Sequence, residues 1–379
     1  MSPRRGAGKW LLSGVLLLAG LAALGPAGDF ALTMRLMRGL HALARRHAAQ
    51  GSPVVETRIR RTMAGREVEA VLYRPLGSRA GRGVVLVPGV SELGCNHPRL
   101  AALARILAGN GFLVVTPDIP SLREFRIEPE AVETISFWHM QMRSLEGGSR
   151  VGSSGLAGIS FSGTLALIAA AKAEAGHAPA FVLAVGAYSD LGRCIRWWFE
   201  PGPVTAAPGT YPTRYYGRWV AMLAALDLLP EGNDRRYLAQ LLRSLLLQKD
   251  TPPAPPCIGN EAARWRWFAC AREDEGDPQL ARQILAHLLA RDAARLSPDH
   301  SAAEIACPVF LAHGAYDDLI PPAESLDLER KILRAPCHLI ISPFLTHTHP
   351  AEHEPGVWEK ARATLRMSLF LYRLVRASR

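Results

Sequence analysis

The sequence predicts an α/β protein with a mostly parallel sheet covered by helices on both faces. Short apolar segments recur at residues 83–87, 112–116, 155–159, 181–185 and 309–312. Most are bounded by Gly or Pro and lead into helical patterns, and this alternation is typical of parallel strands joined by crossover helices. Hydrophobic residues make up 49% of the 379 residues, which is enough for the large core that such a sheet needs.

The other expected elements fit around these strands. Residues 54–61 and 68–73 are β-rich and flank a turn at Ala64 and Gly65, which predicts a hairpin at the start of the sheet. Helices are expected near residues 98–108, 129–145, 164–174, 322–333 and 357–375, and a last strand at 338–341.

The alternation stops between residues 191 and 297, which predicts a helical cap inserted into a core formed by residues 51–190 and 298–379. The cap carries aromatic residues that either line an apolar substrate pocket or pack within the cap itself. These residues are Trp197, Trp198, Phe199, Tyr211, Tyr215, Tyr216 and Trp219.

Residues 1–28 predict a signal peptide or a membrane anchor. Arg4, Arg5 and Lys9 precede an almost uninterrupted apolar run at residues 10–24, which is long for a signal peptide and slightly short for a membrane span. We favour an uncleaved anchor, which predicts a protein associated with a bacterial inner membrane. The alternative is export to the periplasm after cleavage.

Residues 29–50 predict an amphipathic linker helix, because Leu32, Leu36 and Leu40 share one face, away from most of the arginines. Such a helix either lies among lipid headgroups or packs on the domain. The net charge of +10 suits an anionic membrane surface. The basic residues are scattered, with no dense run that includes aromatics, so nucleic-acid binding is not expected.

The sharpest chemical signal is Ser160, which lies between a predicted strand and a predicted helix in the sequence GLAGISFSG. A nucleophilic serine at the tip of such a turn needs small residues two positions before and after it, and Gly158 and Ser162 meet this requirement. Ser162 as nucleophile would instead put the bulkier Thr164 at one of these positions, so Ser160 is preferred.

A serine nucleophile needs a histidine base and a carboxylate that orients the base. Asp317 follows the strand at 309–312 in the pattern H-G-x-x-D-x-x-x-P and is the expected acid. Its neighbour Asp318 is the close alternative, and Asp190, after an earlier strand, is a distant one.

The base is expected after the last strand, where His347 lies at the right distance and His349 remains an alternative. This His-x-His pair has no companion pattern of Asp, Glu or Cys, and the six cysteines form no CxxC pair, so no metal site is predicted, and no other cofactor. Cys257 and Cys270 would close a short loop as a disulfide if the domain is exported, which the sequence leaves open.

The negative oxygen of a tetrahedral intermediate needs two fixed hydrogen-bond donors. One candidate is the backbone N–H of Phe161, directly after Ser160. The other is the N–H of Val90, in the turn after residues 83–87, where Gly89 permits a close backbone approach.

Together, the sequences VVLVPG at 84–89 and GFLVVTPD at 111–118, the Ser160 turn, the Asp317 loop and the His347 segment resemble the α/β-hydrolase superfamily, in its dienelactone-hydrolase-like and esterase-like branches. The resemblance implies the α/β-hydrolase fold and acyl transfer to or from a small-molecule acyl substrate. In that chemistry Ser160 attacks an ester carbonyl, His347 transfers the proton and Asp317 orients the imidazole.

The sequence departs from this family at two positions that bear on the substrate class. Pro88 replaces a histidine that is common before the oxyanion glycine, and Ser162 replaces the last glycine of the serine turn. Three functions remain: a carboxylic ester hydrolase with an apolar capped pocket, a serine peptidase or acyltransferase of the same fold, and a non-catalytic scaffold protein. The complete set of Ser, His and Asp favours the ester hydrolase. The oligomeric state is not predicted.

Overall fold

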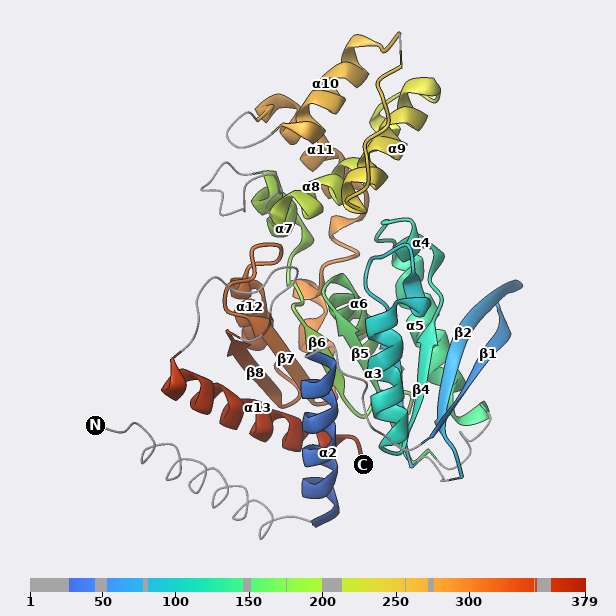
Figure 1. Cartoon of the computed structure of the whole chain (residues 1–379), viewed down its shortest axis with the longest axis vertical. Coiled ribbons are helices and arrows are strands. Elements are labelled where there is room, and N and C mark those ends of the chain that lie inside the picture. The colour runs from blue at the N-terminus through green and yellow to red at the C-terminus, as the bar shows by residue number, and fades with distance from the viewer. Residues whose placement is uncertain are drawn as a thin grey trace.

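Eight strands form one mostly parallel sheet, as the sequence predicts (Figure 1). The computed structural model describes residues 27–44, 53–77, 81–145, 151–174, 176–199, 213–255, 257–271, 276–343, 345 and 356–379. The strand order is β1-β2-β4-β3-β5-β6-β7-β8; β2 runs antiparallel to both β1 and β4, and the other neighbouring pairs are parallel. The strands are β1 (Val54–Met63), β2 (Arg66–Pro75), β3 (Arg82–Val87), β4 (Phe112–Pro117), β5 (Ser153–Ile159), β6 (Val182–Val185), β7 (Val309–Gly314) and β8 (Cys337–Ser342).

Helices cover both faces of the sheet, which explains why its central strands are apolar throughout. Val84 and Leu86 of β3 face one buried cluster, and Val85 and Val87 face the other, because side chains alternate along a strand. The first cluster includes side chains of α2 (Ala27–Ala44), α3 (Pro98–Gly109) and α13 (Val357–Ala377). The second includes side chains of α5 (Pro129–Gln141), α6 (Phe161–Ala171) and α12 (Pro322–Lys331).

The predicted hairpin is present and is longer than its apolar pattern. Ala64 and Gly65 both have positive φ, of 48° and 80°, as a tight two-residue hairpin turn requires. The strands pair up to this turn, with Met63 opposite Arg66. Thr62, Arg66 and Glu67, next to the turn, are polar and exposed. The apolar pattern that predicts the two strands therefore ends before the turn.

The register of the parallel strands brings their carboxyl ends together. Val87 of β3 pairs with Gly158 of β5, and Val185 of β6 pairs both with Ile159 of β5 and with Ala312 of β7. The segments that follow these four strands therefore leave the sheet at one edge. In parallel α/β sheets this is the edge where active groups gather.

The cap stands over the carboxyl edge of the sheet (Figure 1). The sequence carries helical patterns at residues 237–247 and 279–289, and both coincide with described helices of the cap. Cys257 and Cys270 lie in the cap as free thiols. The cap helices are α7 (Leu191–Phe199), α8 (Thr213–Ala224), α9 (Asn233–Leu246), α10 (Asn260–Cys270) and α11 (Pro278–Leu288).

Three of the cap aromatics pack inside the protein. Trp198, Tyr215 and Trp219 are 1%, 1% and 4% exposed and belong to the larger buried cluster. The indole N–H of Trp219 donates to the carbonyl of Ala269 at 2.9 Å. Of the two roles expected for the cap aromatics, these three residues therefore have that of packing within the protein and not that of lining a substrate pocket. Tyr211 lies outside the described residues.

The helix α2 belongs to the domain. Leu32 and Leu36 are buried in the cluster shared with α3 and α13, so the apolar face of α2 packs on protein. At its first turn the buried carboxylate of Asp29 binds Arg82 at 3.1 Å and Arg379 at 2.8 Å, which ties α2 to β3 and to the C-terminal end of α13. In Figure 1, α2 and α13 lie at the end of the molecule away from the cap.

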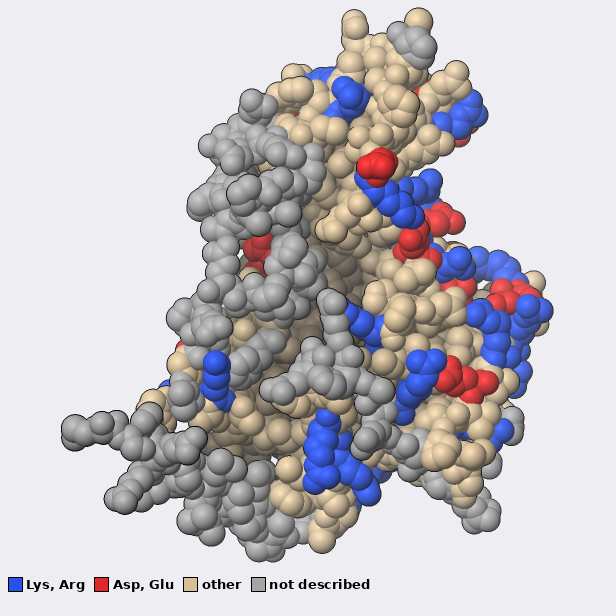
Figure 2. Space-filling model, viewed as in Figure 1, with Lys and Arg blue, Asp and Glu red and all other residues tan. Residues whose placement is uncertain are grey.

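Basic side chains remain on the outer side of α2. Arg35 and Arg38 are exposed, and Figure 2 shows Lys and Arg side chains grouped near the place that α2 occupies in Figure 1. Elsewhere on this face basic and acidic side chains are interspersed. None of the described helices is both long enough and apolar enough to span a membrane. The apolar run at residues 10–24 lies outside the described residues.

Candidate active site

Ser160 lies at the turn between β5 and α6. Its backbone has φ 61° and ψ −134°, a region that residues other than glycine rarely adopt and that is typical of a nucleophile on a tight strand-to-helix turn. The N–H of Ser160 donates to the carbonyl of Val185 at 2.6 Å, which fixes the turn to β6. The helix α6 begins directly after the serine, earlier than the predicted start at residue 164.

Contacts within the turn require the small residues around Ser160. A Cβ on Gly158 would clash with the carbonyl group of Ser162, so no side chain fits at position 158. Ser162 is fully buried, and its hydroxyl donates to the carbonyl of Pro88. The serine that departs from the family pattern therefore binds the turn after β3.

The two expected oxyanion donors lie in neighbouring segments. We call residues 88–91, which contain the expected donor Val90, the oxyanion turn. This turn follows β3, and Ser160 and Phe161 follow β5. The two strands are paired, and paired strands lie about 4.8 Å apart. Phe161 is the first residue of α6, where backbone N–H groups have no acceptor within the helix. The positive end of the helix dipole at Phe161 favours a negative charge.

Asp317 lies in the loop after β7, and we call residues 315–320 the acid loop. The Asp317 side chain is 3% exposed. The Oδ1 atom accepts the backbone N–H groups of Leu319 at 3.1 Å and Ile320 at 3.0 Å, which fix the orientation of the carboxylate. The Oδ2 atom lies 3.5 Å from Nε2 of His313.

His313 is a buried structural residue of β7. Its Nε2 donates to the carbonyl of Ile320 at 2.8 Å, and its Nδ1 lies 2.6 Å from the hydroxyl oxygen of Ser325. The ring therefore joins β7, the acid loop and α12. It supports the loop that carries Asp317.

The two alternative acids have contacts that serve the cap. The backbone carbonyl of Asp318 accepts the indole N–H of Trp197 at 2.8 Å. The side chain of Asp190 accepts the N–H of Arg193 at 3.1 Å, so Asp190 caps the start of α7. Asp318 is half-buried, whereas Asp317 is buried.

Both candidate bases, His347 and His349, lie outside the described residues. The described residue just before them in the sequence is Leu345. Its carbonyl oxygen lies so close to Gly314 that it would clash with a Cβ at that position. Gly314 is the last residue of β7, three positions before Asp317. Leu345, two positions before His347 in the sequence, therefore lies beside the start of the acid loop.

The cap touches the acid loop directly. The indole N–H of Trp197 donates to Asp318, and that of Trp198 donates to the carbonyl of Leu319 at 2.7 Å. The ring of Trp198 also packs edge to face on Phe161, with centroids 5.7 Å apart. One cap helix, α7, thus contacts both the acid loop and the residue after Ser160.

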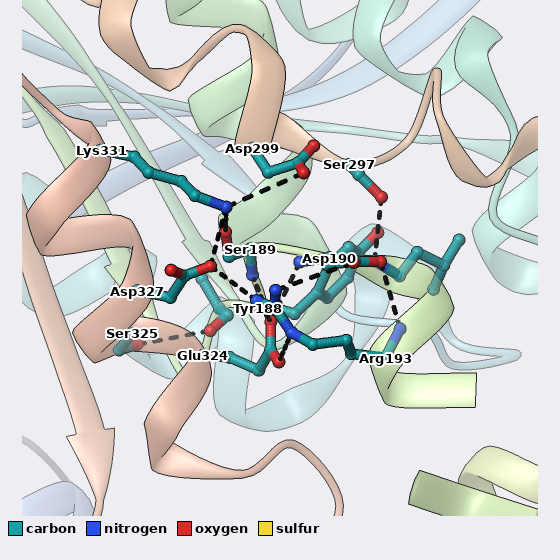
Figure 3. A network of polar contacts seen from close by, with 12 residues as sticks. Tyr188, Ser189, Asp190, Arg193, Ser297, Asp299, Glu324, Ser325, Asp327 and Lys331 are labelled. Atoms are coloured by element: carbon teal, nitrogen blue, oxygen red, sulfur yellow. Dashed lines mark hydrogen bonds and ion pairs between the residues drawn. The ribbon is translucent and has the colours of Figure 1, made fainter. Parts of the chain in front are cut away.

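A polar network, which we call the cap anchor, joins the cap to α12 (Figure 3). It consists of Ser189, Asp190, Arg193, Glu324 and Asp327. The buried Glu324 accepts the N–H groups of Ser189 at 2.9 Å and Asp190 at 3.0 Å, and the Nε of Arg193 at 2.8 Å. Arg193 also binds Asp327 at 2.6 Å. Figure 3 shows the Arg193 side chain between Asp190 and the acidic residues of α12.

The two ends of the cap are joined by one hydroxyl group. The Ser297 hydroxyl accepts the N–H of Leu191 at 2.9 Å and donates to the carbonyl of Ala293 at 2.6 Å. Leu191 and Ser297 are also the predicted limits of the cap. Among the described residues, no group of three His, Cys, Asp or Glu side chains is arranged to hold a metal ion.

These features define the fold. A mostly parallel eight-stranded sheet with an antiparallel second strand, a serine on a positive-φ turn after β5 and a carboxylate after β7 make up the α/β-hydrolase fold. The chain has this fold, as its sequence predicts.

Comparison with known proteins is limited to solved structures, since no family model and no curated protein matches the sequence. The chain is similar to an acylaminoacyl peptidase of Pyrococcus horikoshii, with 15% identity and a TM-score of 0.48 over 85% of this chain and 42% of that one. The chain therefore spans less than half the length of that peptidase.

Two further similar structures are of comparable length. A 2,6-dihydroxy-pseudo-oxynicotine hydrolase has 16% identity and a TM-score of 0.47, over 96% of this chain and 86% of that one. A brefeldin A esterase, a bacterial homologue of human hormone-sensitive lipase, has 15% identity and a TM-score of 0.48, over 91% and 86%. Because all three TM-scores are below 0.5, the fold assignment rests on the strand order and the serine turn of this chain.

The cap anchor leads to a prediction about acid stability. Burial alone would raise the pKa of Asp327, but hydrogen bonds from Lys331 and Arg193 lower it to about 2. A carboxyl group with a lowered pKa stabilises the fold above its usual pKa of 3.8 and loses this contribution as the pH falls towards 2. We predict that Asp327→Asn lowers the free energy of unfolding at pH 6 by about 1 kcal/mol.

The same variant is expected to lose part of the pH dependence of stability between about pH 4 and pH 2, measured by urea unfolding. Asp250→Asn is the matched control, because Asp250 is exposed and forms no ion pair with a described residue. An Asp327→Asn protein whose stability falls with acid as steeply as that of the wild type would contradict this account of the cap anchor.

Proposed function

We propose that the chain is a serine hydrolase that cleaves a carboxylic ester through an acyl-enzyme, with Ser160 as the nucleophile. The observation that carries this proposal is the positive φ of Ser160 at the turn from β5 to α6, which holds the serine at the carboxyl edge of the sheet. The fixed, buried carboxylate of Asp317 in a loop at the same edge supports it.

The proposed reaction proceeds in two halves. The Ser160 Oγ atom attacks the ester carbonyl carbon while its proton passes to the histidine base, and the carbonyl oxygen becomes an oxyanion held by the N–H groups of Val90 and Phe161. The leaving alcohol takes the proton from the base. Water then attacks the acyl-enzyme by the same route and releases the acid. Asp317 orients the imidazole throughout.

We assign the base to His347 and keep His349 as the alternative. The closeness of Leu345 to Gly314 supports a base only a few residues after Leu345, because Leu345 lies beside the start of the acid loop. The substrate site is proposed to be an apolar pocket between cap and core. Half-buried Trp197 and Tyr216 reach from the cap to the acid loop and the oxyanion turn.

The assignment of Ser160 is tested by covalent labelling with a fluorophosphonate. Ser160→Ala is expected to abolish labelling and to lower kcat for p-nitrophenyl esters by about 10⁴-fold or more, because the nucleophile is removed. Ser144→Ala, which changes an exposed serine after α5, should behave as the wild type. Labelling that persists in Ser160→Ala would refute the proposal. Comparing esters of increasing chain length with the matching anilides separates an esterase from a peptidase.

The choice of base is tested by two alanine variants. His347→Ala is expected to lower kcat by at least about 10³-fold, since the serine would lose its proton acceptor, whereas His349→Ala should change kcat less than about 10-fold. The steady-state rate at saturating ester is the measurement. The opposite result would move the base to His349, and full activity in both variants would exclude the mechanism.

We also propose that the predicted N-terminal anchor, residues 1–28, attaches the chain to a membrane. The support is the apolar run at residues 10–24, followed at once by α2 with its exposed Arg35 and Arg38, which suit anionic headgroups. Deletion of residues 1–26 is expected to move the protein from the membrane fraction of expressing cells to the supernatant. A full-length chain found in the supernatant would sink this proposal.

A further inference from the structure

Hydrogen bonds join the oxyanion turn to three other parts of the chain. The buried Ser162 of α6 donates its hydroxyl to the carbonyl of Pro88. The hydroxyl of Tyr216, from the cap helix α8, donates to the carbonyl of Val90 at 2.9 Å. The N–H of Ser91 donates to the carbonyl of Leu122 at 3.2 Å.

Packing does not hold the turn at its glycine. Among the described residues other than its two neighbours in the chain, no heavy atom lies within 4 Å of the place where a Cβ on Gly89 would be. A glycine in open space rotates easily about both of its backbone bonds. The orientation of the peptide unit between Gly89 and Val90 therefore depends on the groups that fix the neighbouring peptide units.

Ser162 fixes the peptide unit before Gly89, and Tyr216 fixes the unit after Val90 together with the Leu122 carbonyl, which accepts the N–H of that unit. The Pro88 carbonyl belongs to the peptide unit before Gly89, and the Val90 carbonyl belongs to the unit after Val90. Because each peptide unit is planar and rigid, holding both carbonyls restricts the unit between them, which carries the Val90 N–H. Donors of an oxyanion hole are effective when their direction is fixed before the reaction starts.

We propose that Tyr216 is a positioning residue of the oxyanion hole, which together with Ser162 holds the Val90 N–H towards the developing oxyanion. This inference rests on the proposed function of Ser160. It also gives a role to Ser162 that a glycine at this position would not have.

The place of Tyr216 in the cap makes its contact dependable. A Cβ on Gly217 would clash with the ring of Trp198, so α8 lies directly on α7, which is itself bonded to the acid loop. The Tyr216 hydroxyl is protonated and can donate at neutral pH, and burial raises its pKa further above the ordinary value of 10. The cap therefore reaches the oxyanion turn through α8 and the acid loop through α7.

The test compares Tyr216→Phe with Tyr237→Phe. Both variants remove one tyrosine hydroxyl from the cap, but the Tyr237 hydroxyl accepts a bond from Arg266 within the cap. We expect Tyr216→Phe to lower kcat for p-nitrophenyl butyrate by about 10-fold, with KM and the unfolding midpoint unchanged, because a misdirected donor costs less than a missing one. Tyr237→Phe should keep the wild-type kcat.

A transition-state analogue separates positioning from a general effect on structure. The ketone carbon of 2,2,2-trifluoroacetophenone is attacked by Ser160 Oγ, the serine proton passes to the base, and the ketone oxygen becomes an oxyanion. Tyr216→Phe and Ser162→Ala should each weaken inhibition by this ketone by the same factor as kcat/KM falls.

Two results would overturn the inference: equal kcat in Tyr216→Phe and Tyr237→Phe, or unchanged inhibition by the ketone in Tyr216→Phe. The proposed function fails in a different way, since Ser160→Ala would then still be labelled by the fluorophosphonate. Loss of labelling in Ser160→Ala together with wild-type behaviour of Tyr216→Phe would leave the hydrolase and remove only the positioning role.

Discussion

The backbone conformation of Ser160 is the constraint around which this edge of the molecule is built. A positive φ at a residue other than glycine costs about 1 to 3 kcal/mol and persists only where the surroundings enforce it. Here Gly158 allows Ser162 to approach without a side chain between them, the Val185 carbonyl fixes the serine N–H, and the helix that follows is buried along almost its whole length. The sheet supplies the rigidity that keeps the serine in place.

The cap is part of this arrangement and more than a cover. The helix α7 bonds to the acid loop through two indole groups, and α8 bonds to the oxyanion turn through Tyr216. The cap anchor fixes the start of α7 to α12. Arg193 and Glu324 are 131 residues apart in the sequence, so this attachment forms only when cap and core fold together. Loosening the cap would therefore disturb the loops that carry Asp317 and Val90.

Local patterns predicted much of the fold and the positions of the candidate groups. Apolar strands, the Ala64 and Gly65 turn, and the spacing of small residues around Ser160 all act within a few residues, so the sequence displays them directly. Tyr216 was recognised only as one of several cap aromatics, because its partner Val90 lies 126 residues away and no local signal joins them. Leu32 and Leu36 form the same stripe whether a helix meets lipid or protein, and only the tertiary contacts with α3 and α13 separate the two.

The position of α2 has a consequence for how a substrate would arrive. This helix and α13 occupy the end of the molecule remote from the cap (Figure 1). With residues 1–26 in a bilayer, the sheet would stand between the lipid and the edge that bears Ser160, and the cap over that edge would lie on the aqueous side. Esters dissolved in the aqueous phase would reach it first, whereas an acyl lipid would have to leave its leaflet before hydrolysis.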